Sequence, residues 1–285
     1  MKVVSKPRLL FRPDPVLGWS LTPGHGVDVK FRPGVVQTIG ADGWRRVPGV
    51  PKAAGHQVAV YGCSFTYGTG LTDDEAYVAL LQKALPDTRM RNRGIGGHST
   101  LQNLLQFRRD IALGQVDVAV FSIISDHRFR NIPHPHRMKR FQNPDWYRLG
   151  VEHVPIIRQG RGNTFAIDYV PIWQPAMQRM DFGSFLPDEH MIDTATLRVL
   201  QEVQTVAGAA DIPLWFALLD REDPAFNETV KTAFPRTTDI SVPLDTEFSF
   251  KPRDTHPNEA ANRQFAERLQ PIISGLLAEN PRGLS

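Results

Sequence analysis

A serine follows an apolar run in the first quarter of the chain. Residues 58–61 (VAVY) are typical of a buried strand, and Gly62, Cys63 and Ser64 come next, before a turn and an expected helix. Such a serine lies at the carboxyl edge of a parallel sheet, where α/β folds bind their ligands. A hydroxyl is a weak nucleophile unless a base takes its proton, so Ser64 alone is equally consistent with an ordinary turn residue.

A candidate base stands near the other end of the sequence. Asp254 precedes His256 by two residues, and Pro257 then opens an expected helix. A carboxylate so placed can orient the imidazole for proton transfer. We therefore predict that Ser64, His256 and Asp254 converge as nucleophile, base and orienting acid.

Acyl transfer to a serine also needs hydrogen-bond donors for the oxyanion of the intermediate. Residues 92–99 (NRGIGGHS) connect an expected strand around Met90 to a helix capped by Ser99 or Thr100. The backbone N–H of Gly97 is expected to face an anion near the positive end of that helix. Gly97 is thus a candidate oxyanion donor.

Together, these segments resemble the sequence blocks of the SGNH/GDSL hydrolase family, in the family's order. Residues 62–66 (GCSFT) are similar to the first block, Gly97 matches the glycine of the second, and Asp254 and His256 match the acid and base of the last. The resemblance implies a flavodoxin-like three-layer α/β/α sandwich with a parallel sheet. It also implies oxyanion donation by the backbone of Ser64 and Gly97, and chemistry without a metal or organic cofactor.

Three positions depart from the family pattern. Cys63 replaces the usual aspartate, and its thiol is a rival nucleophile, although its place at the strand end predicts burial. Ser125 replaces the asparagine that completes the oxyanion hole, and we expect its shorter hydroxyl to take that place; losing one such donor costs about 10²–10³ in rate. The acid is Asp254 where most members carry it one residue earlier, at Arg253, a spacing that some polysaccharide-modifying relatives share.

A basic stretch follows the third expected strand (118–124). Residues 126–140 (DHRFRNIPHPHRMKR) are expected to border the mouth of the site, because they leave the carboxyl end of that strand. We predict that Asp126, His127, Arg128 and Arg130 bind substrate, with the arginines suited to an anionic group. A solvated charged loop is the alternative.

Strands alternate with helices over most of the chain, which predicts an α/β fold with a parallel sheet. Residues 72–75 (TDDE) have the spacing of a capping box ahead of a helix. Residues 1–53, rich in Pro and Gly, are interpreted as an irregular N-terminal extension, and residues 54–285 as the hydrolase-like domain. An insertion at about 141–189 interrupts this alternation with two expected strands, at 154–157 and 165–170. It is predicted to form a lid or wall.

Composition limits the remaining possibilities. The chain has 285 residues, a net charge of +3, one cysteine, and no apolar run approaching the roughly 20 residues of a membrane span. No secretory signal is visible, so a cytoplasmic protein is expected. The net charge is too small to indicate a nucleic-acid partner, and none is expected. The sequence predicts a serine esterase that acts on an O-acylated carbohydrate or small metabolite. An acyltransferase with the same triad, a non-catalytic binding protein on this fold and a phosphate- or RNA-binding module remain as alternatives, and the oligomeric state stays open.

Overall fold

A five-stranded parallel sheet forms the centre of the computed structural model, which describes residues 10–157, 165–172 and 189–279. All neighbouring pairs in it are parallel. In spatial order, the strands are β11 (Thr237–Asp239), β10 (Leu214–Leu218), β7 (Val118–Ile123), β5 (His56–Gly62) and β6 (Thr88–Gly94). Residues 58–62 of β5 and the whole of β7 are buried, as expected for parallel strands with both faces covered.

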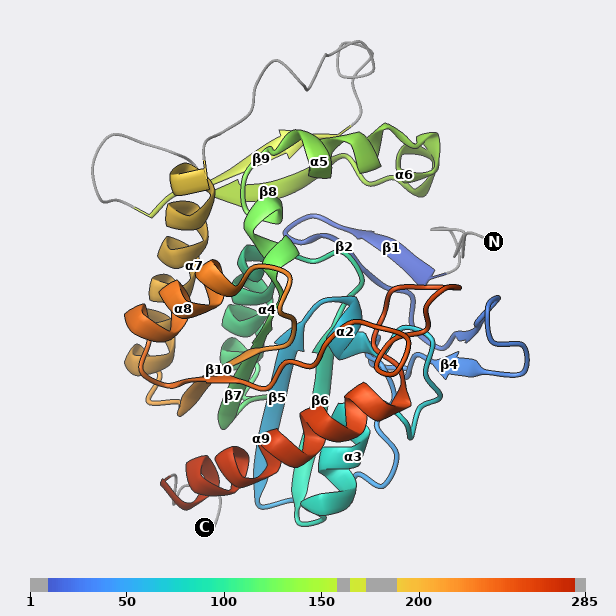
Figure 1. Cartoon of the computed structure of the whole chain (residues 1–285), viewed down its shortest axis with the longest axis vertical. Helices are drawn as coiled ribbons and strands as arrows, with labels where there is room; N and C mark the ends of the chain where they lie inside the picture. Colours follow the sequence, from blue (N-terminus) through green and yellow to red (C-terminus); the bar gives the residue numbers. More distant parts are fainter. Residues whose placement is uncertain (1–9, 158–164, 173–188, 280–285) are drawn as a thin grey trace.

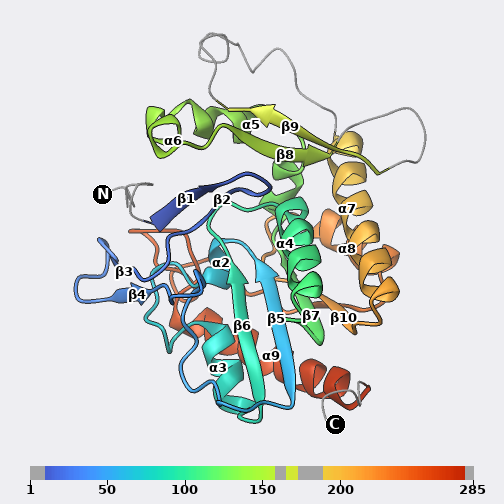
Figure 2. The same cartoon turned by 180° about the vertical axis from the view of Figure 1, so that it is seen from behind.

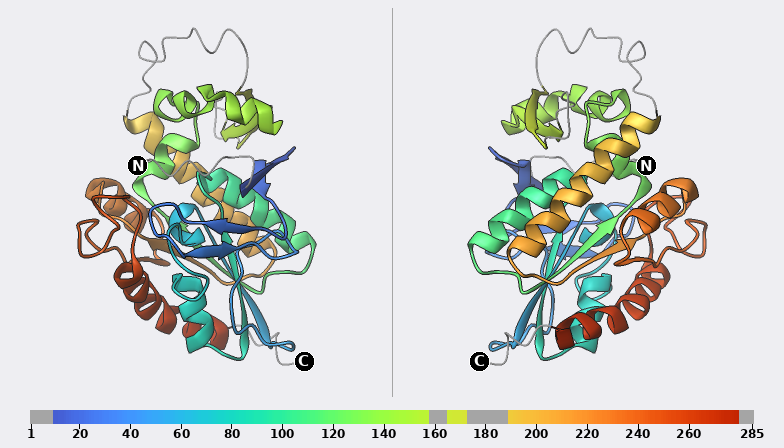
Figure 3. Two further views of the ribbon diagram at one scale, coloured as in Figure 1. Left: turned by 90° about the vertical axis from the view of Figure 1, so that its right-hand side faces the viewer. Right: turned by 90° about the vertical axis from the view of Figure 1, so that its left-hand side faces the viewer.

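Helices cover both faces of this sheet and make three layers (Figure 3). On one side lie α4 (Thr100–Ala112), α7 (Glu189–Ala209) and α8 (Pro224–Ala233); on the other lie α3 (Tyr77–Ala84) and α9 (Glu259–Glu279). Alternate residues of β5 serve the two cores, with Ala59 and Tyr61 in the α4 cluster and Val58 and Val60 in the α9 cluster. The predicted α/β/α sandwich with a parallel sheet is confirmed.

Two local predictions at helix starts had different outcomes. Ser99 caps α4 as predicted: its Oγ accepts the Gln102 N–H at 3.2 Å, and the Gln102 side chain accepts the Ser99 N–H at 2.9 Å. The capping box at 72–75 is wrong, because α3 begins only at Tyr77. Glu75 does accept the N–H of Thr72 at 2.8 Å, but this bond closes a turn, and the carboxylate also pairs with Arg32.

The N-terminal residues pack onto the core as two small antiparallel hairpins. They are β1 (Phe11–Asp14) with β2 (Gly18–Leu21), and β3 (Gly26–Asp28) with β4 (Val36–Thr38). Trp19 and Leu21 of β2 are buried in an apolar cluster that they share with Tyr67 and Ile95 of the core. In Figure 1 both hairpins, in blue, lie around the carboxyl end of the sheet.

The chain after β7 builds a second layer over the same end of the sheet (Figure 2). Its elements are the 3₁₀ helices η1 (Ser125–Arg130) and η2 (Lys139–Gln142), the short helices α5 (Pro135–Met138) and α6 (Pro144–Leu149), and the antiparallel pair β8 (His153–Ile157) and β9 (Ile167–Pro171). This pair matches the two strands expected in the insertion; its residues 158–164 and 173–188 lie outside the described part. No helix in the described ranges is long and apolar enough to cross a membrane.

Candidate active site

A cavity of about 650 Å³ opens at the carboxyl end of the sheet. Ser64, Gly97 and His256, which come from three distant segments, all line it, as do Asp126, Arg130 and Asp254. Of the ten positions considered at the sequence level as nucleophile, acid, base, oxyanion donor or substrate contact, six therefore share one cavity; the other four, Cys63, Ser125, His127 and Arg128, do not line it.

Ser64 is the first residue of the one-turn helix α2 (Ser64–Tyr67), directly after β5 and its cap residue Cys63. The end of β6 passes so close to α2 that a Cβ on Gly94 would lie 2.2 Å from the backbone nitrogen of Tyr67, which explains the glycine there. The Ser64 side chain is half-buried and its Oγ lies 4.0 Å from the Sγ of Cys63. Cys63 itself is only 1% exposed, so the hydroxyl and not the thiol is accessible from the cavity.

Asp254 and His256 form a bonded pair within one tight loop. The imidazole Nδ1 donates to Oδ1 of Asp254 at 2.5 Å, and the same oxygen accepts the backbone N–H of His256 at 2.8 Å. Although burial alone raises the pKa of Asp254, these bonds hold it below its ordinary value. The carboxylate therefore stays charged and keeps Nε2 of His256 free for proton transfer.

The imidazole lies beside the nucleophile segment but is not bonded to it. The ring of Phe65, the residue after Ser64, packs edge-on against His256, with the centroids 5.8 Å apart. No hydrogen bond joins Ser64 Oγ to His256 within the described part of the chain. Catalytic hydrogen bonds are often long or misaligned before substrate binds.

Gly97 occupies a backbone conformation that favours glycine, with φ +79°. Its loop is held from both sides: Trp19 donates from Nε1 to the carbonyl of Gly96 at 3.2 Å, and Arg137 donates from Nη1 to the carbonyl of Gly97 at 3.3 Å. The N–H of Gly97 has no acceptor among the described residues, and Gly97 lines the cavity. An unbonded N–H at the wall of a cavity is available to an anion, as an oxyanion donor must be.

Ser125 does not point its hydroxyl into the cavity, contrary to expectation. Its Oγ donates to Oδ1 of Asp220 at 2.6 Å and accepts the backbone N–H of Asp223 at 3.1 Å, and its own N–H is bonded to the Asp220 carboxylate. Asp220 lies two residues beyond the end of β10, so the hydroxyl ties together the segments that follow β7 and β10. It is not free to complete an oxyanion hole.

The four predicted substrate-binding residues divide into two pairs. Asp126 and Arg130 line the cavity and are paired with each other. His127 is fully buried and neither ring nitrogen has a partner among the described residues. The guanidinium of Arg128 is held by Asp193 at 2.5 Å, and by Asp223 and Glu189.

The side chains of His127 and Arg128 are therefore buried away from the cavity. The structure does not support their predicted contact with substrate. The 3₁₀ helix turns successive side chains to different sides, which the charge pattern alone does not reveal.

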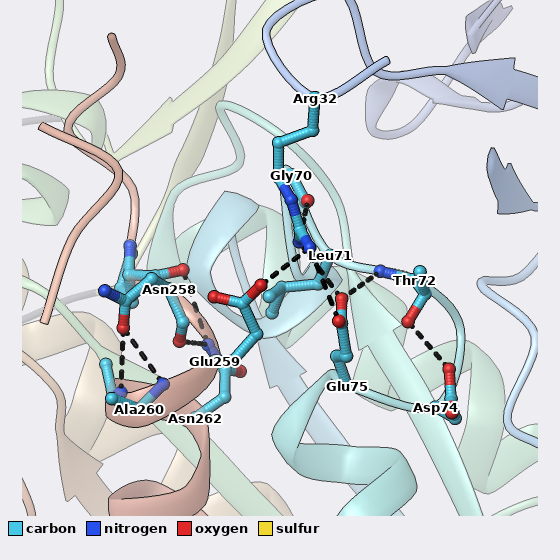
Figure 4. A network of polar contacts seen from close by, with 12 residues as sticks. Arg32, Gly70, Leu71, Thr72, Asp74, Glu75, Asn258, Glu259, Ala260 and Asn262 are labelled. Carbon is cyan, nitrogen blue, oxygen red and sulfur yellow. Dashed lines mark hydrogen bonds and ion pairs between the residues drawn. The ribbon is translucent and has the colours of Figure 1, made fainter. Parts of the chain in front are cut away.

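Arg32, in the loop between β3 and β4, connects the chain after α2 with the start of α9 (Figure 4). Its Nη1 donates to the carbonyl of Gly70 at 2.8 Å and to Glu75 at 3.1 Å, beyond the nucleophile helix. Its Nη2 pairs at 2.6 Å with Glu259, three residues after the candidate base. An arginine of the N-terminal region therefore braces the segments that follow Ser64 and His256 in the chain.

Sequence reasoning missed several residues of the cavity. Trp19 holds the Gly97 loop together with Arg137, which belongs to the basic stretch expected at the mouth of the site. An aromatic wall is formed by side chains from the N-terminal hairpin and the insertion, namely Phe11, Trp19, Phe141 and Trp146. Asp220 was missed although it stands directly after an apolar strand, the same signal that identified Ser64. Within the described ranges, no three His, Cys, Asp or Glu side chains are grouped as metal ligands.

No protein-family model matches the chain, and no curated protein is similar to it in sequence. Solved structures similar to it include TesA (14% identity, 77% of this chain and 99% of that chain, TM-score 0.44). The psychrotrophic esterase EstA from Pseudoalteromonas sp. is another (11%, 78% and 99%, TM-score 0.44). An acetylxylan esterase from Geobacillus stearothermophilus is a third (13%, 77% and 95%, TM-score 0.42).

Proposed function

We propose that the chain is a serine esterase that cleaves its substrate through an acyl-enzyme on Ser64. Nε2 of His256 takes the proton of the Ser64 hydroxyl as Oγ attacks the ester carbonyl, and then gives it to the departing alcohol. Water, activated by the same nitrogen, releases the acyl group. Asp254 orients the imidazole and stabilises its positive charge.

The observation that carries the proposal is the pairing of Asp254 with His256 at the wall of the cavity that Ser64 also lines. A histidine bonded at Nδ1 to a partly buried carboxylate has a defined tautomer, with Nε2 available as the base. The N–H of Gly97, which is bonded to none of the described residues and lies in the same cavity, supplies a donor where negative charge develops. A binding protein would have no need of this arrangement.

The lining of the cavity favours a substrate with one apolar or ring-shaped part and one polar part. The aromatic wall offers flat apolar faces, of the kind that pack against a sugar ring or an acyl chain. Lys30, His136, Arg140 and Lys251 line the same cavity and suit a polar or anionic group. An O-acylated carbohydrate or small metabolite meets both requirements.

Two alternatives use the same site. An acyltransferase would pass the acyl group to an acceptor hydroxyl instead of water, and the size of the cavity leaves room for one. A non-catalytic binding protein is favoured by the engagement of Ser125 with Asp220, which removes the expected oxyanion donor.

The test is turnover of short-chain activated esters by matched variants. We expect Ser64→Ala to abolish turnover while the unfolding temperature stays within a few degrees, because the hydroxyl packs against little. Cys63→Ala is the control and should keep most of the activity. An active Ser64→Ala protein together with an inactive Cys63→Ala protein would show that the thiol is the nucleophile. Wild-type protein that turns over no ester and no acyl donor would favour the binding protein.

A further inference from the structure

The oxyanion site has two backbone donors but lacks the side-chain donor that the sequence led us to expect. Ser64 and Gly97 supply the backbone N–H groups, whereas the Ser125 hydroxyl is bonded to Asp220. Removing one donor from such a site costs about 10²–10³ in rate. An efficient esterase would need a donor from another residue of the cavity wall.

Arg130 is bonded to the segment that carries Gly97 and lines the same cavity as Ser64. Its Nη1 donates to the carbonyl of His98 at 2.9 Å, the residue after Gly97. The side chain of Cys63, the residue before Ser64, is near enough to raise the pKa of Arg130. Arg130 lines the cavity although only 6% of its surface is exposed, so the group is confined to this place.

The guanidinium is anchored and keeps an N–H group that is not engaged in a hydrogen bond among the described residues. Nε donates to Asp126 at 2.9 Å and Nη2 pairs with the same carboxylate oxygen, while Nη1 is bonded to His98. A guanidinium carries five N–H groups, and these three bonds together with the interaction with Cys63 leave one of them unused among the described residues. Burial alone lowers the pKa of Arg130, but Cys63 and Asp126 raise it above its ordinary value, so the group stays charged.

We propose that Arg130 is the third oxyanion donor, taking the place that Ser125 leaves empty. This inference rests on the proposed esterase function. As Ser64 Oγ forms its bond to the carbonyl carbon, the π pair moves to the carbonyl oxygen and the hydroxyl proton passes to Nε2 of His256. A remaining N–H of Arg130 donates to that oxygen beside the N–H groups of Ser64 and Gly97. When the intermediate collapses, the C=O bond re-forms and the alcohol leaves with the proton from His256.

A donor to the oxyanion acts mainly in the transition state, so its removal should lower kcat and leave KM nearly unchanged. We expect Arg130→Met to lower kcat by about 10²–10³ on a short neutral ester, and Arg130→Lys by about tenfold, because an ammonium keeps the charge but loses the planar fork. The matched control is Arg128→Met, which removes another buried arginine of the same 3₁₀ helix, one that does not line the cavity. It should leave kcat and KM unchanged.

Steady-state kinetics of the folded variants, with thermal unfolding recorded for each, decide the matter. If Arg130→Met does not fold, Arg130→Lys is judged by the same split between kcat and KM. The proposal is overturned if the Arg130 variants keep kcat within about twofold, if their loss lies wholly in KM, or if Arg128→Met loses kcat as much. A wild-type protein that neither turns over esters nor reacts with a fluorophosphonate would instead overturn the esterase function itself, and this inference with it.

Discussion

Two neighbouring parts of the same sheet edge carry the site in different ways. At the ends of β5 and β6, the nucleophile turn and the Gly97 loop are shaped by backbone conformation, by close packing at Gly94 and by the positive φ of Gly97. At the end of β7, residues 125–130 are shaped by side chains whose partners lie elsewhere, such as Asp220 for Ser125. Roles set by the backbone follow from local spacing, whereas roles set by distant side chains do not.

The largest effect should come from the base that serves the β5 end. His256→Ala should lower kcat by about 10³–10⁴ or more, because Ser64 then has no group to take its proton. The fold should persist, since the imidazole is a quarter exposed and, among the described residues, is hydrogen-bonded only within its own loop. Activity of this variant within tenfold of wild type would mean that another group is the base, and that the end of β5 does not work with His256.

Replacing Arg128 tests whether the residues after β7 stabilise the fold or contact the substrate. Its guanidinium is held by Asp193, Asp223 and Glu189, and its side chain is only 5% exposed. Arg128→Met should lower the free energy of unfolding by about 2–3 kcal/mol, less than for a fully buried pair because the carboxylates reach solvent. Urea unfolding measures this loss. A variant with unchanged stability but a raised KM for anionic esters would restore Arg128 as a substrate contact.

The Gly97 loop should give the protein part of its acid sensitivity through His98. This imidazole is buried, with Nε2 bonded to the carbonyl of Trp19 at 3.0 Å. Burial, and to a lesser degree the nearby charge of Arg137, lower its pKa from 6.5 to about 3.

Between these two pH values, the unfolded chain binds a proton that the folded chain does not. Stability is therefore fully present above about pH 6.5 and falls, by up to about 1.4 kcal/mol per pH unit, as the pH drops toward 3. His98→Gln should remove this component of the pH dependence of urea unfolding, while the same change at the exposed His190 should not. Equal acid sensitivity in wild type and His98→Gln would contradict the assignment.

The smallest effect is expected at Ser125. Ser125→Ala should leave kcat within about threefold of wild type, because the hydroxyl is bonded to Asp220 and not to the substrate. Stability should fall by about 1–2 kcal/mol, since Asp220 and the N–H of Asp223 each lose a partner. A loss of 10² or more in kcat would show that the hydroxyl turns into the cavity during the reaction. The ends of β5 and β7 would then both contribute groups to catalysis.

The sequence predicted those parts of the fold and site that local spacing sets. Hydrophobic periodicity and turn residues were enough to predict the parallel strands, the flanking helices and the cap at Ser99, because these features are written in short stretches of sequence. The pairing of Asp254 with His256 was predictable for the same reason, being a contact over two residues. The inward turn of Arg128 depends on acids 61–95 residues away, and no spacing rule reports such contacts. The wall formed by Trp19 was hidden by the irregular pattern of the N-terminal region.

The central claim is that Ser64 is an activated nucleophile in a formed site. Wild-type protein treated with a fluorophosphonate and digested for mass spectrometry should carry one adduct, on the peptide that contains Ser64. Heat-unfolded protein and His256→Ala should carry little or none, because activation requires the assembled base. Absence of an adduct in folded wild-type protein, or an adduct on any other residue, would contradict the account.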